Sequence, residues 1–152
     1  RRPIDMGELL THSLNLRSIA WQECNSALAA VKALGPREGM RIRSRSKSSS
    51  AIDLGESRCW YVALHNYRYW GDAQLECLNG AVWTMRFTFH VKDLFDFEPS
   101  EWPVFECAHY MQATGLATPF FVGGDREVLV PLSKGQCPRE RFYLSAHDGG
   151  AC

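Results

Sequence analysis

The clearest pattern in the chain is an alternation of hydrophobic and polar residues from Trp83 to Lys92. The hydrophobic positions, which share one side of a two-residue period, are Trp83, Met85, Phe87, Phe89 and Val91. The polar positions, on the other side, are Thr84, Arg86, Thr88, His90 and Lys92. Such a period is typical of a β-strand that buries one face. We therefore predict a strand here, with its hydrophobic side against the core.

Neighbouring hydrophobic runs predict that this strand belongs to a meander. Asn79-Gly80 separates it from an apolar run over residues 72–78, and Asn-Gly favours a tight β-hairpin. A β-branched and aromatic run over residues 59–69 comes before Trp70-Gly71, which we interpret as the break between two strands. The sequence thus predicts an antiparallel meander from Cys59 to Lys92. Further short strands are expected over residues 118–122, 126–132 and 141–145.

Helical periodicity marks the N-terminal part of the chain. Over residues 11–34, apolar residues recur at steps of three and four: Leu16, Ile19, Ala20, Cys24, Ala27, Leu28 and Val31. Thr11 or Ser13 is expected to cap this helix, and Gly35-Pro36 to end it. A shorter helix is predicted over residues 100–115, with a serine at its N-cap and a glycine after its end.

These elements predict an α+β fold. We expect a curved antiparallel sheet with an N-terminal helix, a short helix after the third strand, and the helices to one side. Residues 1–152 are expected to form a single domain, large enough to bury about two-thirds of its unfolded surface. The chain begins with RRPID and no methionine, so we expect a piece of a longer protein.

Charge is balanced over the whole chain, with 17 basic and 17 acidic residues, so no overall attraction to nucleic acid or to an anionic membrane is expected. One segment departs from this balance, because Arg41, Arg43, Arg45 and Lys47 alternate with small residues. They could form a strand edge that binds phosphate or lipid headgroups. The serine run that follows favours the other interpretation, a solvated mobile loop.

Six cysteines occur without any CxxC pair, at positions 24, 59, 77, 107, 137 and 152. This spacing argues against a structural zinc site. The cysteines are either buried small hydrophobic residues or disulfide partners in an oxidising compartment. Cys59 and Cys77, on adjacent predicted strands, are the favoured pair.

Three carboxylates follow the central strand closely: Asp93, Asp96 and Glu98. Alternation from Phe89 carries Asp93 to the core-facing side, where an ionised carboxylate needs donors or a cation. Asp93 and Asp96 could bind a divalent metal, Mg²⁺ or Ca²⁺, or one could orient the other as a general base. The alternative is that they only cap turns.

His109 lies on the predicted short helix, 13 residues after Asp96, and could return to these carboxylates. Arg86 and His90, on the polar face of the preceding strand, could border the same edge, and Lys92 and Arg126 are further candidates to bind a substrate. Carboxylates, an imidazole and cations together suit phosphodiester or phosphoryl-transfer chemistry, in which the cations take up developing charge.

The run DLFDF, residues 93–97, is an Asp-x-aromatic-Asp motif after a long strand, and His109 follows it. In this it resembles the activity domain of the colicin M-type bacteriocins, with Asp93, Asp96 and His109 at the family's catalytic positions. Phe95 stands where the family has Tyr, and Tyr110 where it has Arg. The phrase ATGLATPFFVGG also looks like part of the C-terminal toxin domains of secreted polymorphic toxins.

The resemblance implies an antibacterial toxin domain at the C-terminus of a longer secreted protein. It would hydrolyse lipid II, the lipid-linked peptidoglycan precursor, at its undecaprenyl-pyrophosphate linkage in the periplasm of target bacteria, with a divalent metal. A cognate immunity protein would be its partner. Two alternatives stay open. One is a non-enzymatic domain that inserts into membranes or binds a partner. The other is a nuclease toxin using His90, His109 and the basic segment, against which the neutral charge argues.

Overall fold

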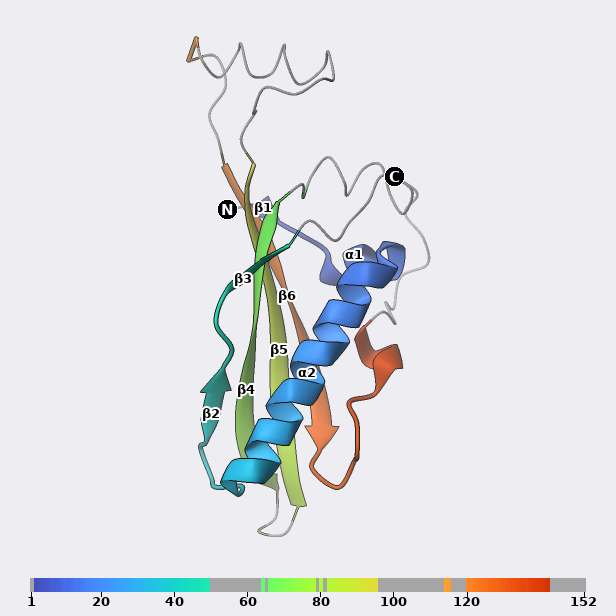
Figure 1. Ribbon diagram of the computed structural model, residues 1–152, viewed down its shortest axis with the longest axis vertical. Helices are drawn as coiled ribbons and strands as arrows, with labels where there is room; N and C mark the ends of the chain where they lie inside the picture. Colours follow the sequence, from blue (N-terminus) through green and yellow to red (C-terminus); the bar gives the residue numbers. More distant parts are fainter. Residues whose placement is uncertain are drawn as a thin grey trace.

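The structure, a computed structural model, describes residues 2–49, 64, 66–78, 80, 82–95, 114–115 and 120–142 (Figure 1). Its helical segments are α1 (Met6–His12), α2 (Leu14–Leu34) and the 3₁₀ turn η1 (Arg139–Phe142). Its strands are β1 (Arg2–Pro3), β2 (Arg41–Arg43), β3 (Lys47–Ser49), β4 (Tyr67–Leu78), β5 (Val82–Phe95) and β6 (Phe120–Pro131).

The strands form one sheet in the order β1-β6-β5-β4-β2, and β3 also pairs with β4. All pairings are antiparallel except the short one between β1 and β6. Helix α2 runs along one face of this sheet, and α1 and η1 lie on the same side (Figure 1). The predicted α+β fold, with its N-terminal helix against an antiparallel sheet, is confirmed. No helix in the described part of the chain is long and apolar enough to cross a membrane.

The predicted central strand is β5, and its alternation is confirmed. Met85, Phe87, Phe89 and Val91 have no exposed surface, and they pack with apolar residues of α1 and α2 in a single core. Trp83, at the start of the strand, is partly buried against the same core. The polar set of β5 therefore faces away from the helices.

Strand β4 corrects the expectation of a break at Trp70-Gly71. The strand runs without interruption from Tyr67 to Leu78, paired with β5 along its length. A glycine is required at position 71 by close packing rather than by a break in the strand. A Cβ atom there would lie 2.6 Å from the ring of Phe87, so a larger residue would overlap this core side chain.

The Asn79-Gly80 hairpin is confirmed, since it joins β4 to β5 and Gly80 has a φ of 71°. Two of the expected short strands are in fact one, because β6 continues through Gly123 and Gly124. The third was predicted over residues 141–145, but residues 141 and 142 belong to η1.

The N-terminal helix is divided at Ser13, which confirms one of the two proposed caps. The Ser13 hydroxyl accepts a hydrogen bond from the backbone N–H of Leu16 at 3.1 Å. Its own N–H donates to the Leu9 carbonyl at 3.0 Å and so closes α1. Gly35 ends α2 with a φ of 80°, as expected. The helix predicted over residues 100–115 lies outside the described residues, apart from Thr114 and Gly115.

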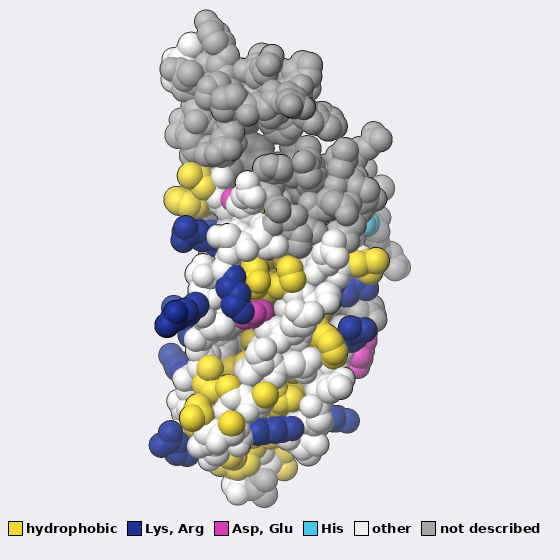
Figure 2. Space-filling view, viewed as in Figure 1, with side chains coloured by type: hydrophobic (Ala, Val, Ile, Leu, Met, Phe, Trp, Pro, Cys, Tyr) yellow, Lys and Arg dark blue, Asp and Glu magenta, His cyan; other side chains and the backbone are white. Residues whose placement is uncertain are grey.

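The loop interpretation of the basic segment is wrong for most of its length. Arg41–Arg43 and Lys47–Ser49 are the strands β2 and β3, and both pair with β4. In the view from the α2 side, Lys and Arg side chains are spaced along the margin formed by β2 and β3 (Figure 2). Pairing with β4 provides the fixed geometry that a loop would lack.

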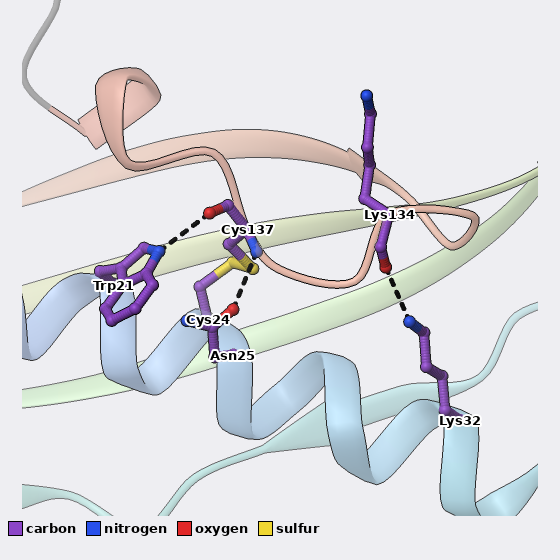
Figure 3. The surroundings of a disulfide bond; sticks show 6 residues. All are labelled: Trp21, Cys24, Asn25, Lys32, Lys134 and Cys137. Atoms are coloured by element: carbon purple, nitrogen blue, oxygen red, sulfur yellow. Dashed lines mark hydrogen bonds between the residues drawn. A yellow bond between two sulfur atoms is a disulfide. The ribbon is translucent and has the colours of Figure 1, made fainter.

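A disulfide between Cys24 and Cys137 ties α2 to the segment after β6 (Figure 3). Both cysteines are buried, and hydrogen bonds surround the bridge. The indole of Trp21 donates to the Cys137 carbonyl at 2.8 Å, and the Cys137 N–H donates to the Asn25 side chain at 2.8 Å. The favoured Cys59–Cys77 pair is not supported, because Cys77 is a free thiol. Cys59 lies outside the described residues.

Candidate functional site

The face of the sheet opposite the helices is covered by no other element of the described chain, and we call it the open face. Its charged and large apolar side chains project from β2, β4, β5 and β6. They are Arg41, Arg43, Arg68, Trp70, Asp72, Glu76, Val82, Arg86, His90, Lys92, Leu94, Phe121, Asp125, Glu127 and Leu129. This face carries most of the polar set that the alternation in β5 identifies.

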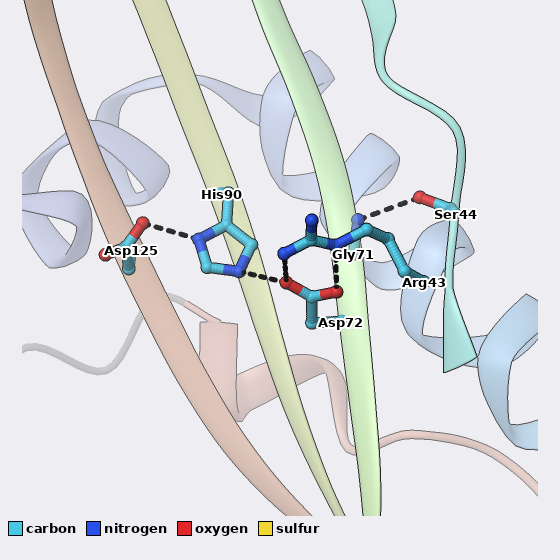
Figure 4. A network of polar contacts seen from close by, with 6 residues as sticks. All are labelled: Arg43, Ser44, Gly71, Asp72, His90 and Asp125. Atoms are coloured by element: carbon cyan, nitrogen blue, oxygen red, sulfur yellow. Dashed lines mark hydrogen bonds and ion pairs between the residues drawn. The ribbon is translucent and has the colours of Figure 1, made fainter. Parts of the chain in front are cut away.

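A network of polar contacts crosses the middle of the open face (Figure 4). Arg43 donates two hydrogen bonds to the Asp72 carboxylate, at 2.7 and 3.0 Å. Nε2 of His90 lies 2.9 Å from Oδ2 of Asp72, and Nδ1 of the same ring lies 2.6 Å from Oδ1 of Asp125. The Trp70 ring stacks on the imidazole with a centroid separation of 4.9 Å. Four strands are thus linked in one line.

The charged groups of this network stabilise the sheet by pairing with one another. Hydrogen bonding to Arg43 lowers the pKa of the Asp72 carboxyl, and His90 adds to the effect. Carboxylates of the two neighbouring strands therefore flank the ring of His90, with a hydrogen bond at Nδ1 and an ion-pair distance at Nε2. We conclude that the network orders the face rather than performing chemistry.

Arg86 is also committed to carboxylates on the open face. It donates to Glu76 at 2.9 and 3.2 Å and to Glu127 at 2.7 Å. These contacts bind β4, β5 and β6 together, and hydrogen bonding to Arg86 lowers the pKa of the Glu76 carboxyl. A guanidinium held by two carboxylates is poorly placed to bind an anionic substrate as well.

The cations near the end of β5 are arranged differently. Arg68 on β4 and Lys92 on β5 are directly opposite each other, with Ser48 and Gly123 as the next residues on either side. Like charges in direct cross-strand register destabilise a sheet unless something compensates them. The Lys92 ammonium lies 4.1 Å from the centre of the Phe121 ring, and no carboxylate of the described residues pairs with either cation.

Among the described residues, the unpaired charge on the open face is therefore all positive. Its four described carboxylates are each engaged by Arg43, Arg86 or His90: Asp72, Glu76, Asp125 and Glu127. Within the described ranges, the cations of this face without an ion-pair partner are Arg41, Arg68 and Lys92. The chain as a whole is neutral, so this positive character is local to the face.

The residues predicted for a site lie on different faces of the sheet. Arg86, His90 and Lys92 lie on the open face. Asp93 is half-buried on the other face, opposite buried Val122, as alternation predicted. Arg126 is on that face too, but four positions away along the strand pair, and donates to the Arg141 carbonyl at 3.0 and 3.2 Å. Asp96, His109 and Glu98 lie outside the described residues.

Two ligands are expected for a metal. Asp93 belongs to the described residues, and Asp96 does not. In the described part of the chain, no group of three or more His, Cys, Asp and Glu side chains could hold a metal ion. Asp72, His90 and Asp125 do not converge on one point, because the two acids lie against opposite nitrogens of the ring. A divalent metal bound by Asp93 and Asp96 therefore stays a prediction.

A shallow hollow of about 210 Å³ on the helical side is a weaker candidate. Leu14, Arg17, Trp21 and Arg139 line it, together with a serine. Arg17 donates to two carbonyls at the end of α1, at 2.9 and 3.0 Å. The Arg139 guanidinium lies over the Trp21 ring at 4.1 Å. Both cations are thus engaged within the protein.

Sequence reasoning missed Arg68, which turns out to be the neighbour of Lys92. Its only sequence signal was a basic residue in a predicted strand. The like-charged pair becomes visible only once the register between β4 and β5 is known.

No protein-family model, curated protein or solved structure matches this chain. The resemblance to the colicin M-type domain thus remains a prediction that rests on residues 93–97 and His109.

Proposed function

We propose that this chain is an antibacterial toxin domain that hydrolyses a lipid-linked pyrophosphate at the outer surface of the bacterial inner membrane. The observation that carries the proposal is the end of β5. Three successive residues there supply a cation, a half-buried carboxylate and an exposed apolar side chain: Lys92, Asp93 and Leu94. A lipid-linked pyrophosphate presents the matching groups, an anionic headgroup next to a hydrocarbon chain.

In this proposal Asp93 is the essential carboxylate. Its position at the edge of the core restricts its contact with water, and a carboxylate there is suited to hold and deprotonate an attacking water molecule. Hydrolysis would add that water across the lipid–pyrophosphate linkage and give a polyprenol and a soluble headgroup. Asp96 would orient the water and His109 would act as general acid or base, as the family resemblance implies.

Lys92 and Arg68 would contact the phosphates. Both lie at the same end of the sheet as Asp93, and neither is neutralised by a described carboxylate. Fixed cations of this kind stabilise negative charge that develops on phosphate oxygens. Arg86 and His90, in contrast, serve the sheet, because carboxylates already occupy them.

The buried disulfide favours action outside the cytoplasm. Cys24 and Cys137 are bridged in the core, and disulfides persist in oxidising compartments such as the bacterial periplasm. We therefore propose a secreted domain that acts in the periplasm of target cells and is neutralised by an immunity protein.

The proposal is tested by expressing the domain with and without a periplasmic signal, and by assaying purified protein on a lipid-linked pyrophosphate in detergent. Periplasmic toxicity and release of the soluble headgroup are expected. Asp93→Asn should abolish both while the far-UV circular dichroism spectrum and Tm stay close to those of the parent. Asp125→Asn, at a carboxylate on the open face, is the matched control and should retain hydrolysis. Full activity of Asp93→Asn would refute the assignment.

A non-enzymatic binding domain is the second candidate. One observation favours it. The described carboxylates on the open face are all engaged in ion pairs within the sheet and form no catalytic group. For such a domain, toxicity would survive Asp93→Asn, and dye would leak from liposomes that contain no pyrophosphate lipid. Toxicity confined to the cytoplasm would point instead to the nuclease alternative.

A further inference from the structure

We propose that one end of the open face docks on anionic phospholipid bilayers. The surface consists of Leu94 and Phe121 with the adjacent pair Arg68 and Lys92, and we call it the docking end. The proposal rests on the proposed function and deepens it, because docking would bring the end of β5, with Lys92, to a membrane that carries a lipid-linked substrate. Its test is separate, however, because it uses membranes that contain no such substrate.

The apolar half of the docking end is a pair of exposed side chains in register. Leu94 and Phe121 are directly opposite each other on β5 and β6, and their exposed fractions are 44% and 47%. Large apolar side chains that face water together, as a pair in register, mark interaction surfaces more often than isolated ones do. An aromatic ring and a branched aliphatic chain are also suited to the boundary between headgroups and acyl chains.

The cationic half lies one step further along the same strands. Arg68 and Lys92 are in direct register, and Ser48 adds a hydroxyl beside Arg68. Two cations held side by side repel each other in the free protein. An anion that binds between them removes this repulsion, so the pair favours a ligand carrying negative charge. Lipid phosphates offer such charge at high density.

The order of these residues favours a membrane over a soluble anion. From the end of β5 inward, the open face presents first the apolar pair, then the cations, and then the ring of Trp70 stacked on His90. A protein that rests this end on a bilayer would place apolar groups deepest and cations at the level of the phosphates, as peripheral membrane proteins do. A free phosphate would give the exposed Leu94 and Phe121 no role.

The test measures sedimentation of the purified domain with vesicles of phosphatidylcholine alone and of phosphatidylcholine mixed with phosphatidylglycerol. Binding to the mixed vesicles, weakened by added salt, is expected. The Arg68→Gln and Lys92→Gln substitutions should each lower the partition coefficient about fivefold, the effect of one basic residue near an anionic surface. Arg41→Gln is the matched control. It removes an unpaired cation from the same face three rows away and should change the partition less than about twofold, because such interactions have a short range.

The apolar half has its own matched pair. Leu94→Ser should lower the partition about tenfold, because part of a leucine side chain no longer leaves water. Leu129→Ser, at a leucine 51% exposed on the same face but distant from the docking end, should leave partition near the parent value. Melting curves should confirm that all five variants fold.

Two results would overturn the proposal: no binding to the mixed vesicles, or binding that the control substitutions reduce as much as those at the docking end. Equal binding to both kinds of vesicle would also contradict it, since the cations would then contribute nothing. Headgroup release from a substrate in detergent is measured in parallel with the same variants. Release without vesicle binding would remove the docking end and leave the hydrolase proposal intact, and binding without release would do the reverse.

Discussion

Arg43 donates two hydrogen bonds to the Asp72 carboxylate, at 2.7 and 3.0 Å, and so links β2 to β4. The bidentate geometry is the stronger form of an arginine–carboxylate contact. The same carboxylate receives His90 on its other side, at 2.9 Å. Strand β2 has only three residues, so this contact contributes to holding the strand in place.

The stability of the protein should depend on the ionisation of Asp72. Hydrogen bonding to Arg43 lowers its pKa in the folded state below the usual value, which is about 3.9 in an unfolded chain. The ion pair therefore stabilises the fold at pH values above about 4, and this contribution is lost as the pH falls through the lower, folded pKa. Asp72→Asn should lower Tm by a few degrees at neutral pH, and the difference from the parent should shrink towards zero in strong acid.

Thermal melts followed by circular dichroism from neutral to strongly acidic pH measure this dependence. Glu140→Gln serves as the control, because Glu140 is exposed and has no partner among the described residues. It should leave Tm almost unchanged at every pH. A difference between parent and Asp72→Asn that stays constant down to the lowest pH would contradict the role given to the ion pair.

Gly71 should not tolerate a larger residue. A Cβ atom there would approach the Phe87 ring to 2.6 Å, within a core that has no room to shift freely. Gly71→Ala is expected to lower the free energy of unfolding by about 1–3 kcal/mol. Gly135→Ala is a matched control, since no atom lies within 4 Å of the added methyl group.

Urea denaturation of a double variant tests the steric conflict between Gly71→Ala and Phe87 a second time. Phe87→Leu alone should destabilise the fold by leaving a cavity. Combined with Gly71→Ala, it should cost less than the sum of the two single changes, because the smaller side chain leaves space for the methyl group. Simple additivity would show that the two residues do not conflict.

The Cys24–Cys137 bridge should contribute strongly to stability, because it closes a loop across 113 residues of sequence. Replacing both cysteines with serine is expected to lower the free energy of unfolding by about 3–5 kcal/mol. Cys77→Ser should have a much smaller effect, since that thiol is free. Peptide mapping by mass spectrometry under non-reducing conditions tests the pairing directly. A linked peptide that joins Cys24 to another cysteine would contradict the structure.

Local patterns predicted the parts of the fold that local physics determines. The alternation around Phe87 and the Asn79-Gly80 turn each depend on a few neighbouring residues, and both identified their elements correctly. The reason for Gly71 could not be found in this way, because the ring that excludes a side chain belongs to the next strand. The bridge between Cys24 and Cys137 joins segments that no local pattern relates.

The candidate site was predictable only in part for the same reason. Alternation placed Asp93 correctly on the core-facing side of β5 and Lys92 on the other side. It could not show that carboxylates from neighbouring strands already occupy Arg86 and His90. The register between β4 and β5, set by pairing along the whole hairpin, is what brings Arg68 opposite Lys92.

In the proposed hydrolysis, Lys92 and Arg86 should therefore behave differently, although both are cations on the polar side of β5. Lys92→Gln removes a charge that no described carboxylate neutralises, and it should lower kcat/KM for a lipid-linked pyrophosphate by about tenfold, equivalent to roughly 1.4 kcal/mol of transition-state stabilisation. Arg86→Gln frees Glu76 and Glu127 from their ion pairs, so its main effect should be a Tm lower by a few degrees. Headgroup release and thermal melts on the same preparations compare the two. If Arg86→Gln reduces kcat/KM more than Lys92→Gln at a temperature where both variants are folded, Arg86 rather than Lys92 contacts the phosphates.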